Sequence, residues 1–456
     1  MNFDQFPANF IWGTAISAAQ TEGMPQADGA GLSIWDEFCL RKGKIKNKQN
    51  TQLGCNFYTH YKSDIALLKK LEIPNFRFSI AWPRIYPNGH GHVNHPGLDF
   101  YKRLIDNCLE QGIRPWATLY HWDLPAALEA QGGWINRSVV SWFKEYVLTI
   151  AMHLGDRVKD WFVLNEPMAF TGAGYFLGLH APGKMGMSSF IPAMHHAALC
   201  QAEGGRILRS EFSDANIGTS FSMSQVQSAS ENPSDLQAAE KVHALLNRLF
   251  LEASLGYGYP IKELRFLEKV EKYIRPGDEK RLEFDFDFIG IQNYTREIVS
   301  SNWYTPYLQA KMIPAKIRKV ALTAMDWEIY PPALYNVLKF ASSYEKVKSI
   351  IVSENGAAFI EPQPHNGLAD TARIEFIKQN IYQLKRAIAE SDKIKGYFIW
   401  SFLDNFEWAE GFDPRFGLVH VDFETQKRTI KHSGYWYRKF IMDQLSNIPL
   451  NTQSAI

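Results

Sequence analysis

Two glutamates stand where strongly apolar segments end. Glu166 follows the run Trp161–Leu164, and Glu354 follows the run Ile350–Val352. Runs of this kind predict buried strands, so each carboxylate is expected at the edge of a sheet rather than in its core. Cleavage of a glycosidic bond needs two carboxyl groups, because one donates a proton while the other attacks the sugar or activates water. The two glutamates therefore suggest a site that cleaves glycosides.

The elements that must position these glutamates alternate between strand-like runs and stretches with helical periodicity. This alternation predicts right-handed βαβ units and a parallel sheet. Eight repeats in a chain of this length predict a single (β/α)8 barrel (a TIM barrel) with extended βα loops. The predicted strands are Phe10–Ala15, Asn75–Ile80, Pro115–Tyr120, Trp161–Asn165, Asn216–Phe221, Phe286–Asn293, Ser349–Glu354 and Gly396–Ser401. The predicted helices include Tyr58–Leu71, Leu98–Glu110, Val139–Leu154, Ile191–Phe212, Leu236–Leu255, Thr371–Glu390 and Thr429–Met442.

The barrel is predicted to occupy residues 1–446 as one catalytic domain, followed by a C-terminal tail over residues 447–456. Loops are predicted over residues 42–52, 300–322 and 361–368. The alternative is an open doubly wound sheet with a second domain. No Gly-x-Gly-x-x-Gly follows the first strand, which weighs against a dinucleotide-binding version of that fold. In barrels the catalytic groups gather at the C-terminal strand ends, so Glu166 and Glu354 are expected to face each other across the barrel mouth.

Composition narrows the class of ligand. The 456 residues carry a formal net charge of +1, so no long-range field attracts nucleic acid or an anionic membrane, and we expect a neutral small molecule as partner. The four cysteines show no metal-binding spacing, and neither a metal nor a cofactor is predicted.

No signal peptide and no apolar run of ~20 residues is evident, which predicts a cytoplasmic protein. The oligomeric state, monomer or homo-oligomer, is left open.

Other polar and aromatic residues fall at or just beyond the predicted strand ends. Taken singly, such a residue is more often structural than functional. Arg77 is different, because an unpaired buried charge costs several kcal/mol and this residue must therefore have a carboxylate partner. That partner could be structural, or it could be a nucleophile that the guanidinium keeps ionised. The residues in question are Gln20, Arg77, His121, Trp122, Asp123, Tyr294, Trp400, Glu407 and Trp408.

Together these residues match a known family. The chain resembles the retaining β-glycosidases of glycoside hydrolase family one, nearly from end to end. Seven motifs in the same order carry the resemblance, which makes it highly specific. They are Phe10–Ala15 with Gln20 and Glu22-Gly23, Arg77–Arg84, Tyr120–Pro125, Asn165–Pro167, His180–Gly183, Ser353–Gly356 and Trp400–Trp408.

The resemblance implies a role for each residue. Glu166 would be the general acid/base and Glu354 the nucleophile, with Arg77 and Tyr294 supporting the nucleophile. The activity implied is that of a retaining β-glucosidase acting on terminal glucosyl residues of small β-glucosides or cello-oligosaccharides, with β-galactosides and β-fucosides as further candidates. The implied substrate contacts are Gln20, His121, Trp122, Asn165 (on the sugar 2-hydroxyl), Trp400, Glu407, Trp408 and Phe416, with His180, Trp327 and Met168 on the aglycone side.

One position separates two substrate classes. The related 6-phospho-β-glycosidases typically have Ser followed by a Lys and a Tyr where this chain has Glu407, Pro414 and Phe416. A carboxylate about 4 Å from a phosphate costs on the order of 4 kcal/mol at an effective dielectric near 20. That cost weakens binding roughly a thousandfold. The sequence therefore favours an unphosphorylated sugar.

The chain departs from the family pattern at a few positions. Gln292-Asn293-Tyr294 stands where the family usually has Asn-Tyr-Tyr, and Met168 stands where Trp often follows the Asn-Glu-Pro motif.

Other functions within the fold are also considered. Plant thioglucosidases replace the acid/base with Gln, whereas Glu166 is present here. The remaining alternatives are a 6-phospho-β-glycosidase and a non-catalytic sugar-binding barrel. Transglycosylation would use the same residues as hydrolysis.

Overall fold

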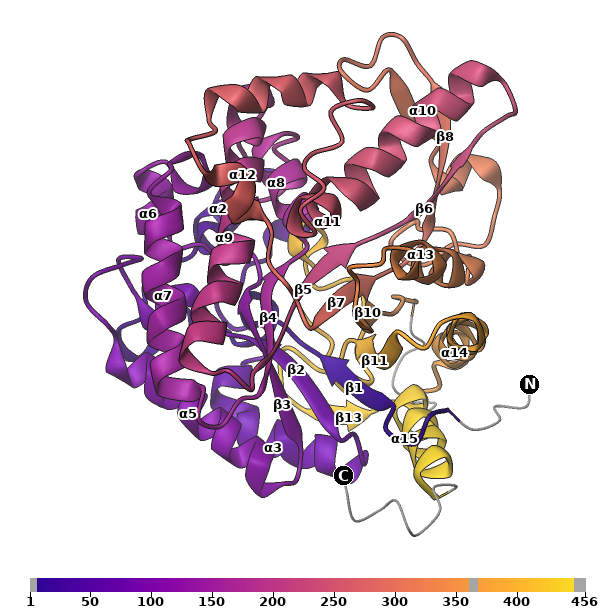
Figure 1. Cartoon of the computed structure of the whole chain (residues 1–456). Coiled ribbons are helices and arrows are strands. Elements are labelled where there is room, and N and C mark those ends of the chain that lie inside the picture. The colour runs from indigo at the N-terminus through magenta and orange to yellow at the C-terminus, as the bar shows by residue number, and fades with distance from the viewer. Residues whose placement is uncertain (1–5, 361–367, 447–456) are drawn as a thin grey trace.

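Eight parallel strands close into a barrel in the computed structural model, which describes residues 6–360 and 368–446 (Figure 1). The strand order around the barrel is β1-β11-β10-β7-β5-β4-β3-β2. The predicted (β/α)8 architecture is confirmed. The predicted tail over 447–456, and all but the last residue of the predicted loop over 361–368, lie outside the described residues. The barrel strands are β1 (Ile11–Ala15), β2 (Asn75–Ser79), β3 (Arg114–Tyr120), β4 (Asp160–Asn165), β5 (Asn216–Ser222), β7 (Phe288–Gln292), β10 (Ile350–Asn355) and β11 (Ile394–Trp400).

Helices follow the barrel strands and surround them (Figure 1). The main ones are α3 (Phe57–Lys70), α5 (His95–Glu110), α7 (Val139–Leu154), α9 (Met187–Glu211), α10 (Pro233–His243), α11 (Leu249–Ser254), α13 (Pro332–Ser342), α14 (Thr371–Glu390) and α15 (His432–Ser446). Shorter helices lie in the connections: α1 (Ala18–Thr21), α2 (Ile34–Cys39), α4 (Trp82–Ile85), α6 (Ala126–Ala130), α8 (Pro167–Tyr175) and α12 (Asp278–Leu282).

An additional three-stranded sheet lies beyond the ends of β5 and β7 (Figure 1). It contains β6 (Gln225–Ser228), β8 (Arg296–Ser301) and β9 (Ala310–Met312). The loop predicted over residues 300–322 is therefore partly wrong, because β9 pairs antiparallel with β8. Strand β9 has only three residues, too few for a periodic pattern to identify it, so its pairing with β8 reveals it.

Two helix predictions also need correction, and α13 was not predicted. The helix predicted over Leu236–Leu255 is divided into α10 and α11 by a π-helical turn over Ala244–Arg248. The helix predicted from Thr429 begins at His432, because Arg428–Ile430 forms strand β13 and pairs with β12 (Val419–Val421).

Large side chains fill the interior of the barrel. Trp116, Phe162, Phe288, Ile351 and Phe398 come from five different strands and pack into one buried cluster. The barrel is therefore a packed core rather than a pore, as usual for this fold. This cluster forms a floor, and a functional site must lie above it, at the C-terminal ends of the strands.

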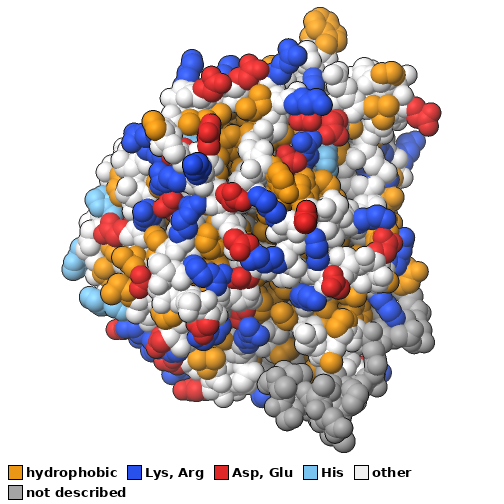
Figure 2. Space-filling view, in the orientation of Figure 1, with side chains coloured by type: hydrophobic (Ala, Val, Ile, Leu, Met, Phe, Trp, Pro, Cys, Tyr) orange, Lys and Arg blue, Asp and Glu red, His pale blue; other side chains and the backbone are white. Residues whose placement is uncertain are grey.

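Charged side chains of both signs are interspersed over the face shown in Figure 2, consistent with the net charge of +1. Among the described helices, none is long and apolar enough to cross a lipid bilayer.

Candidate active site

A cavity of about 360 Å³ opens at the C-terminal end of the barrel. The structure brings twelve of the predicted site residues together in its wall. Arg77, Asn165 and Met168 do not line it: the first two are buried behind the wall, and Met168 packs against the main hydrophobic core while its neighbour Ala169 faces the cavity. The twelve are Gln20, His121, Trp122, Glu166, His180, Tyr294, Trp327, Glu354, Trp400, Glu407, Trp408 and Phe416.

Glu354 lies at the end of β10 and accepts three hydrogen bonds. Arg77 donates to Oε1 over 2.5 Å, Gln292 donates to Oε1 over 2.8 Å, and the Tyr294 hydroxyl donates to Oε2 over 2.6 Å. Burial raises the pKa of Glu354, while Arg77 and Tyr294 act in the opposite direction. The donors favour the ionised form.

Arg77 has the carboxylate partner that its buried position requires, and that partner is Glu354. Its guanidinium also donates to Asn165 and to Thr118, and it lies 4.5 Å from the centre of the Phe162 ring. The aromatic floor of the barrel thus supports Arg77, and Arg77 orients Glu354.

Glu166 occupies a different environment, between β4 and α8. It has a left-handed backbone conformation with φ of 46°, because the chain turns sharply before Pro167 starts the helix. Burial and the nearby Glu354 charge raise the pKa of Glu166 to about 8, against weaker opposing effects of Ser222 and Arg77. Compared with Glu354, Glu166 therefore retains its proton to the higher pH.

Two tryptophans in the cavity wall share this unusual backbone conformation. Trp122 has φ of 79° and Trp408 has φ of 50°. A left-handed conformation is costly for a bulky residue and persists only where the surrounding structure enforces it. Together with Glu166, three cavity residues are held in strained positions, as is common at functional sites.

His121 is neutral and presents a hydrogen-bond donor. Asn165 accepts hydrogen bonds from Arg77 and Gln292 through Oδ1, so its amide nitrogen faces His121 Nε2 at 3.0 Å. The proton of the ring therefore resides on Nδ1, which is buried and has no partner among the described residues. Burial and the Arg77 charge lower the pKa of His121 well below its usual value, so the imidazole stays uncharged.

Glu407 supplies an acceptor with no partner. Its side chain is 9% exposed, and Oε2 is buried without a hydrogen bond to any described residue. Burial, followed by the Glu354 and Glu166 charges, raises the pKa of Glu407 to about 8. A ligand with hydroxyl groups would satisfy this carboxyl group as well as the His121 N–H.

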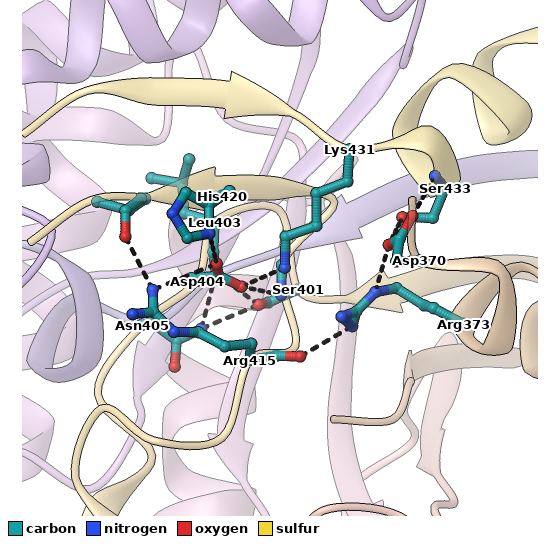
Figure 3. Close-up of polar contacts among 12 residues, drawn as sticks. Asp370, Arg373, Ser401, Leu403, Asp404, Asn405, Arg415, His420, Lys431 and Ser433 are labelled. Carbon is teal, nitrogen blue, oxygen red and sulfur yellow. Dashed lines mark hydrogen bonds and ion pairs between the residues drawn. The ribbon is translucent and has the colours of Figure 1, made fainter. Parts of the chain in front are cut away.

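A buried polar network anchors the segment that carries Glu407 (Figure 3). Asp404 accepts a hydrogen bond from Lys431 over 2.7 Å, and Arg415 lies 3.4 Å away. Burial alone would raise the pKa of Asp404, but Lys431, His420 and Arg415 together outweigh burial and hold the pKa well below its usual range. The adjacent Asn405 amide donates to the Leu403 carbonyl over 3.0 Å. These contacts fix the position of Glu407 relative to the barrel.

Replacing Lys431 by Met should destabilise the protein by about 3–5 kcal/mol, because it removes the closest cation from the buried Asp404 and leaves the charge to Arg415, which lies 3.4 Å away. Denaturant unfolding measures this change. Lys427→Met is the matched control, since that lysine is exposed on the same hairpin, and it should change the free energy of unfolding by less than about 0.5 kcal/mol. Equal stability of the two variants would contradict the anchoring role.

With this geometry in view, the family can be decided. The sequence model of Glycosyl hydrolase family 1 matches residues 2–445. The chain belongs to Glycosyl hydrolase family 1. It is 41% identical to Beta-glucosidase A of Thermotoga maritima over 443 residues, covering 97% of this chain and 98% of the relative. Beta-glucosidase A of Acetivibrio thermocellus is 41% identical over 441 residues, covering 96% and 98%.

Solved structures of family 1 support the same assignment. The Thermotoga maritima β-glucosidase in complex with deoxynojirimycin superposes with a TM-score of 0.93 at 40% identity, covering 96% of this chain and 99% of that chain. The complex of that enzyme with glucoimidazole gives a TM-score of 0.91 at 39% identity.

This family 1 site also contains residues that the sequence analysis missed. Ser222 lines the cavity at the end of β5, and the strand-end rule could have found it. Glu297, Met325 and Glu410 also line it. No local signal marks Glu297, because it belongs to the additional sheet, whose position depends on tertiary pairing.

Proposed function

We propose that the chain is a retaining β-glucosidase that hydrolyses terminal, unphosphorylated β-D-glucosyl residues from small glucosides and cello-oligosaccharides. One observation carries this proposal: the cavity brings together Glu166 and Glu354, two buried carboxyl groups with different partners. Glu354 is held by three donors, whereas the pKa of Glu166 is raised to about 8. When the environments of two carboxyl groups shift their pKa values apart, the group with the higher pKa acts as the acid and the other as base or nucleophile. The β-glucosidase names of the relatives agree with this reading.

The mechanism proceeds by double displacement. The ionised Glu354 attacks the anomeric carbon, while the protonated Glu166 donates to the glycosidic oxygen and the aglycone leaves. This step forms a covalent glucosyl-enzyme on Glu354. Glu166, now ionised, removes a proton from water, which displaces Glu354 from the sugar. The β configuration is retained and both carboxyl groups return to their starting states.

The remaining wall residues fit the binding of a neutral sugar. Glu407 offers an acceptor and His121 an N–H donor, and both lack protein partners among the described residues. Trp400 offers a flat apolar surface for the C–H face of the ring. No lysine or arginine is found among the described residues lining the cavity, so a phosphate group would meet no cation there.

The proposal also includes a metabolic role and a cellular location. Cello-oligosaccharides would connect the enzyme with cellulose degradation in carbohydrate metabolism. A cytoplasmic location is proposed from the sequence alone.

The substrate class is tested with nitrophenyl glycosides of glucose, galactose, fucose and 6-phosphoglucose. At a pH above the Glu407 pKa of about 8, where this carboxylate is mainly ionised, we expect kcat/KM for the glucoside to exceed that for the 6-phosphoglucoside by roughly a thousandfold, because the carboxylate repels the phosphate. Glu407→Ser should lower kcat/KM for the glucoside. It should also reduce the ratio of kcat/KM for the glucoside to kcat/KM for the 6-phosphoglucoside. Equal or faster cleavage of the phosphorylated substrate by the native enzyme would overturn the proposed substrate.

A further inference from the structure

Five glutamates line the cavity, and they lie at two depths. Glu166, Glu354 and Glu407 are buried, whereas Glu297 is partly exposed and Glu410 is exposed. The two less buried glutamates therefore lie nearer the mouth, on the side from which a leaving group departs. The mechanism uses neither of them.

Strand geometry directs Glu297 toward the cavity. It lies on β8 opposite Val226 of β6, in the additional sheet beyond the barrel (Figure 1). Successive side chains of a strand point to opposite faces. The preceding Arg296 forms an ion pair with Glu328 over 2.8 Å, and Glu297 faces the cavity.

The Glu297 carboxylate accepts no hydrogen bond and forms no ion pair with the described residues. The cation that acts on it electrostatically is Arg318, which is already bound to Glu328 over 2.6 Å. Burial raises the pKa of Glu297 to about 7, with Arg318 lowering it and Glu328 raising it. By contrast, Glu410 has a cation within reach, because Lys46 lies 3.8 Å away. Glu297 is thus the cavity-mouth carboxylate that a ligand can engage.

We propose that Glu297 determines leaving-group specificity, favouring aglycones that carry a cationic or hydrogen-bond-donating group and disfavouring anionic aglycones. This inference rests on the proposed glucosidase function. An ammonium group at the cavity mouth would gain an ion pair with a carboxylate that has no competing partner. A carboxylate on the aglycone would meet like charge, and the described residues of the wall include no lysine or arginine to offset it.

The test compares three phenyl β-glucosides that carry an aminoethyl, a hydroxyethyl or a carboxymethyl group in the para position. These groups are separated from the ring, so the three phenols are similar as leaving groups and differ in charge. The assay is run about one unit above the pKa of Glu297, near pH 8, where the carboxylate is mainly ionised.

In the native enzyme we expect kcat/KM to decrease in the order aminoethyl, hydroxyethyl, carboxymethyl. Glu297→Gln keeps the shape and removes the charge, and it should reduce the aminoethyl-to-carboxymethyl ratio by about fivefold, mainly through KM. Glu110→Gln is the matched control, since that exposed residue ends α5 just before β3, at the opposite end of the barrel, and should leave the ratio unchanged.

Two results would overturn the inference. A ratio in Glu297→Gln equal to that in Glu110→Gln would refute the role of Glu297 while leaving the glucosidase assignment in place. Failure of the native enzyme to cleave any of the three glucosides would refute the proposed function and the inference with it.

Discussion

Replacing Glu354 by Ala should reduce turnover of an aryl β-glucoside by on the order of 10⁵–10⁶-fold, the scale expected when a catalytic nucleophile is removed. The reason is that, among the described residues lining the cavity, no other carboxylate accepts hydrogen bonds from three donors. Azide should restore activity on an activated substrate such as dinitrophenyl β-glucoside, because the small anion fits the space left by the carboxymethyl group.

The product of this rescue identifies the position of the missing group. Azide replaces Glu354 on the face opposite the leaving group, so the product should be α-glucosyl azide. Glu354→Gln is the matched control, since its side chain fills the same space and should block the rescue. Thermal unfolding of both variants excludes a loss of fold. Absence of the α-azide product would show that Glu354 is not the nucleophile.

Replacing Glu166 by Gln should reduce kcat/KM by roughly 10²–10⁴-fold for glucosides with poor leaving groups. Dinitrophenyl glucoside should be affected far less, because dinitrophenolate leaves without a proton. The parameter kcat/KM reports the glycosylation step, in which Glu166 acts as an acid, so the comparison isolates that role.

The pH dependence gives a second measurement of the same group. The active form of Glu166 is protonated and its pKa is about 8, so native kcat/KM for a poor substrate should fall as pH rises through this value. Glu166→Gln should remove that limb of the profile. In Glu166→Ala, azide should yield the β-glucosyl azide, the opposite anomer from that formed with Glu354→Ala. An equal loss for all leaving groups would argue against an acid role.

The barrel was predictable because its signals are local. Hydrophobic runs such as Trp161–Leu164 and the helical periodicity between such runs identify the alternating elements without knowledge of their packing. The positions of Glu166 and Glu354 at strand ends follow from the same local pattern. This approach fails at β9, because three residues are too few to show a periodicity and the strand is recognised only by its pairing with β8.

The sequence by itself determined the fold class, the two glutamates at strand ends and the need of Arg77 for a carboxylate partner. The family resemblance implied Glu354 as that partner, and the tertiary structure shows the ion pair, because strands β2 and β10 are distant in sequence and meet at the barrel mouth. The separation of the two pKa values likewise depends on burial and on donors from Arg77, Gln292 and Tyr294. The orientation of Glu297 toward the cavity follows from long-range pairing in the additional sheet. Electrostatic environment is a property of groups brought together by folding, and no local pattern encodes it.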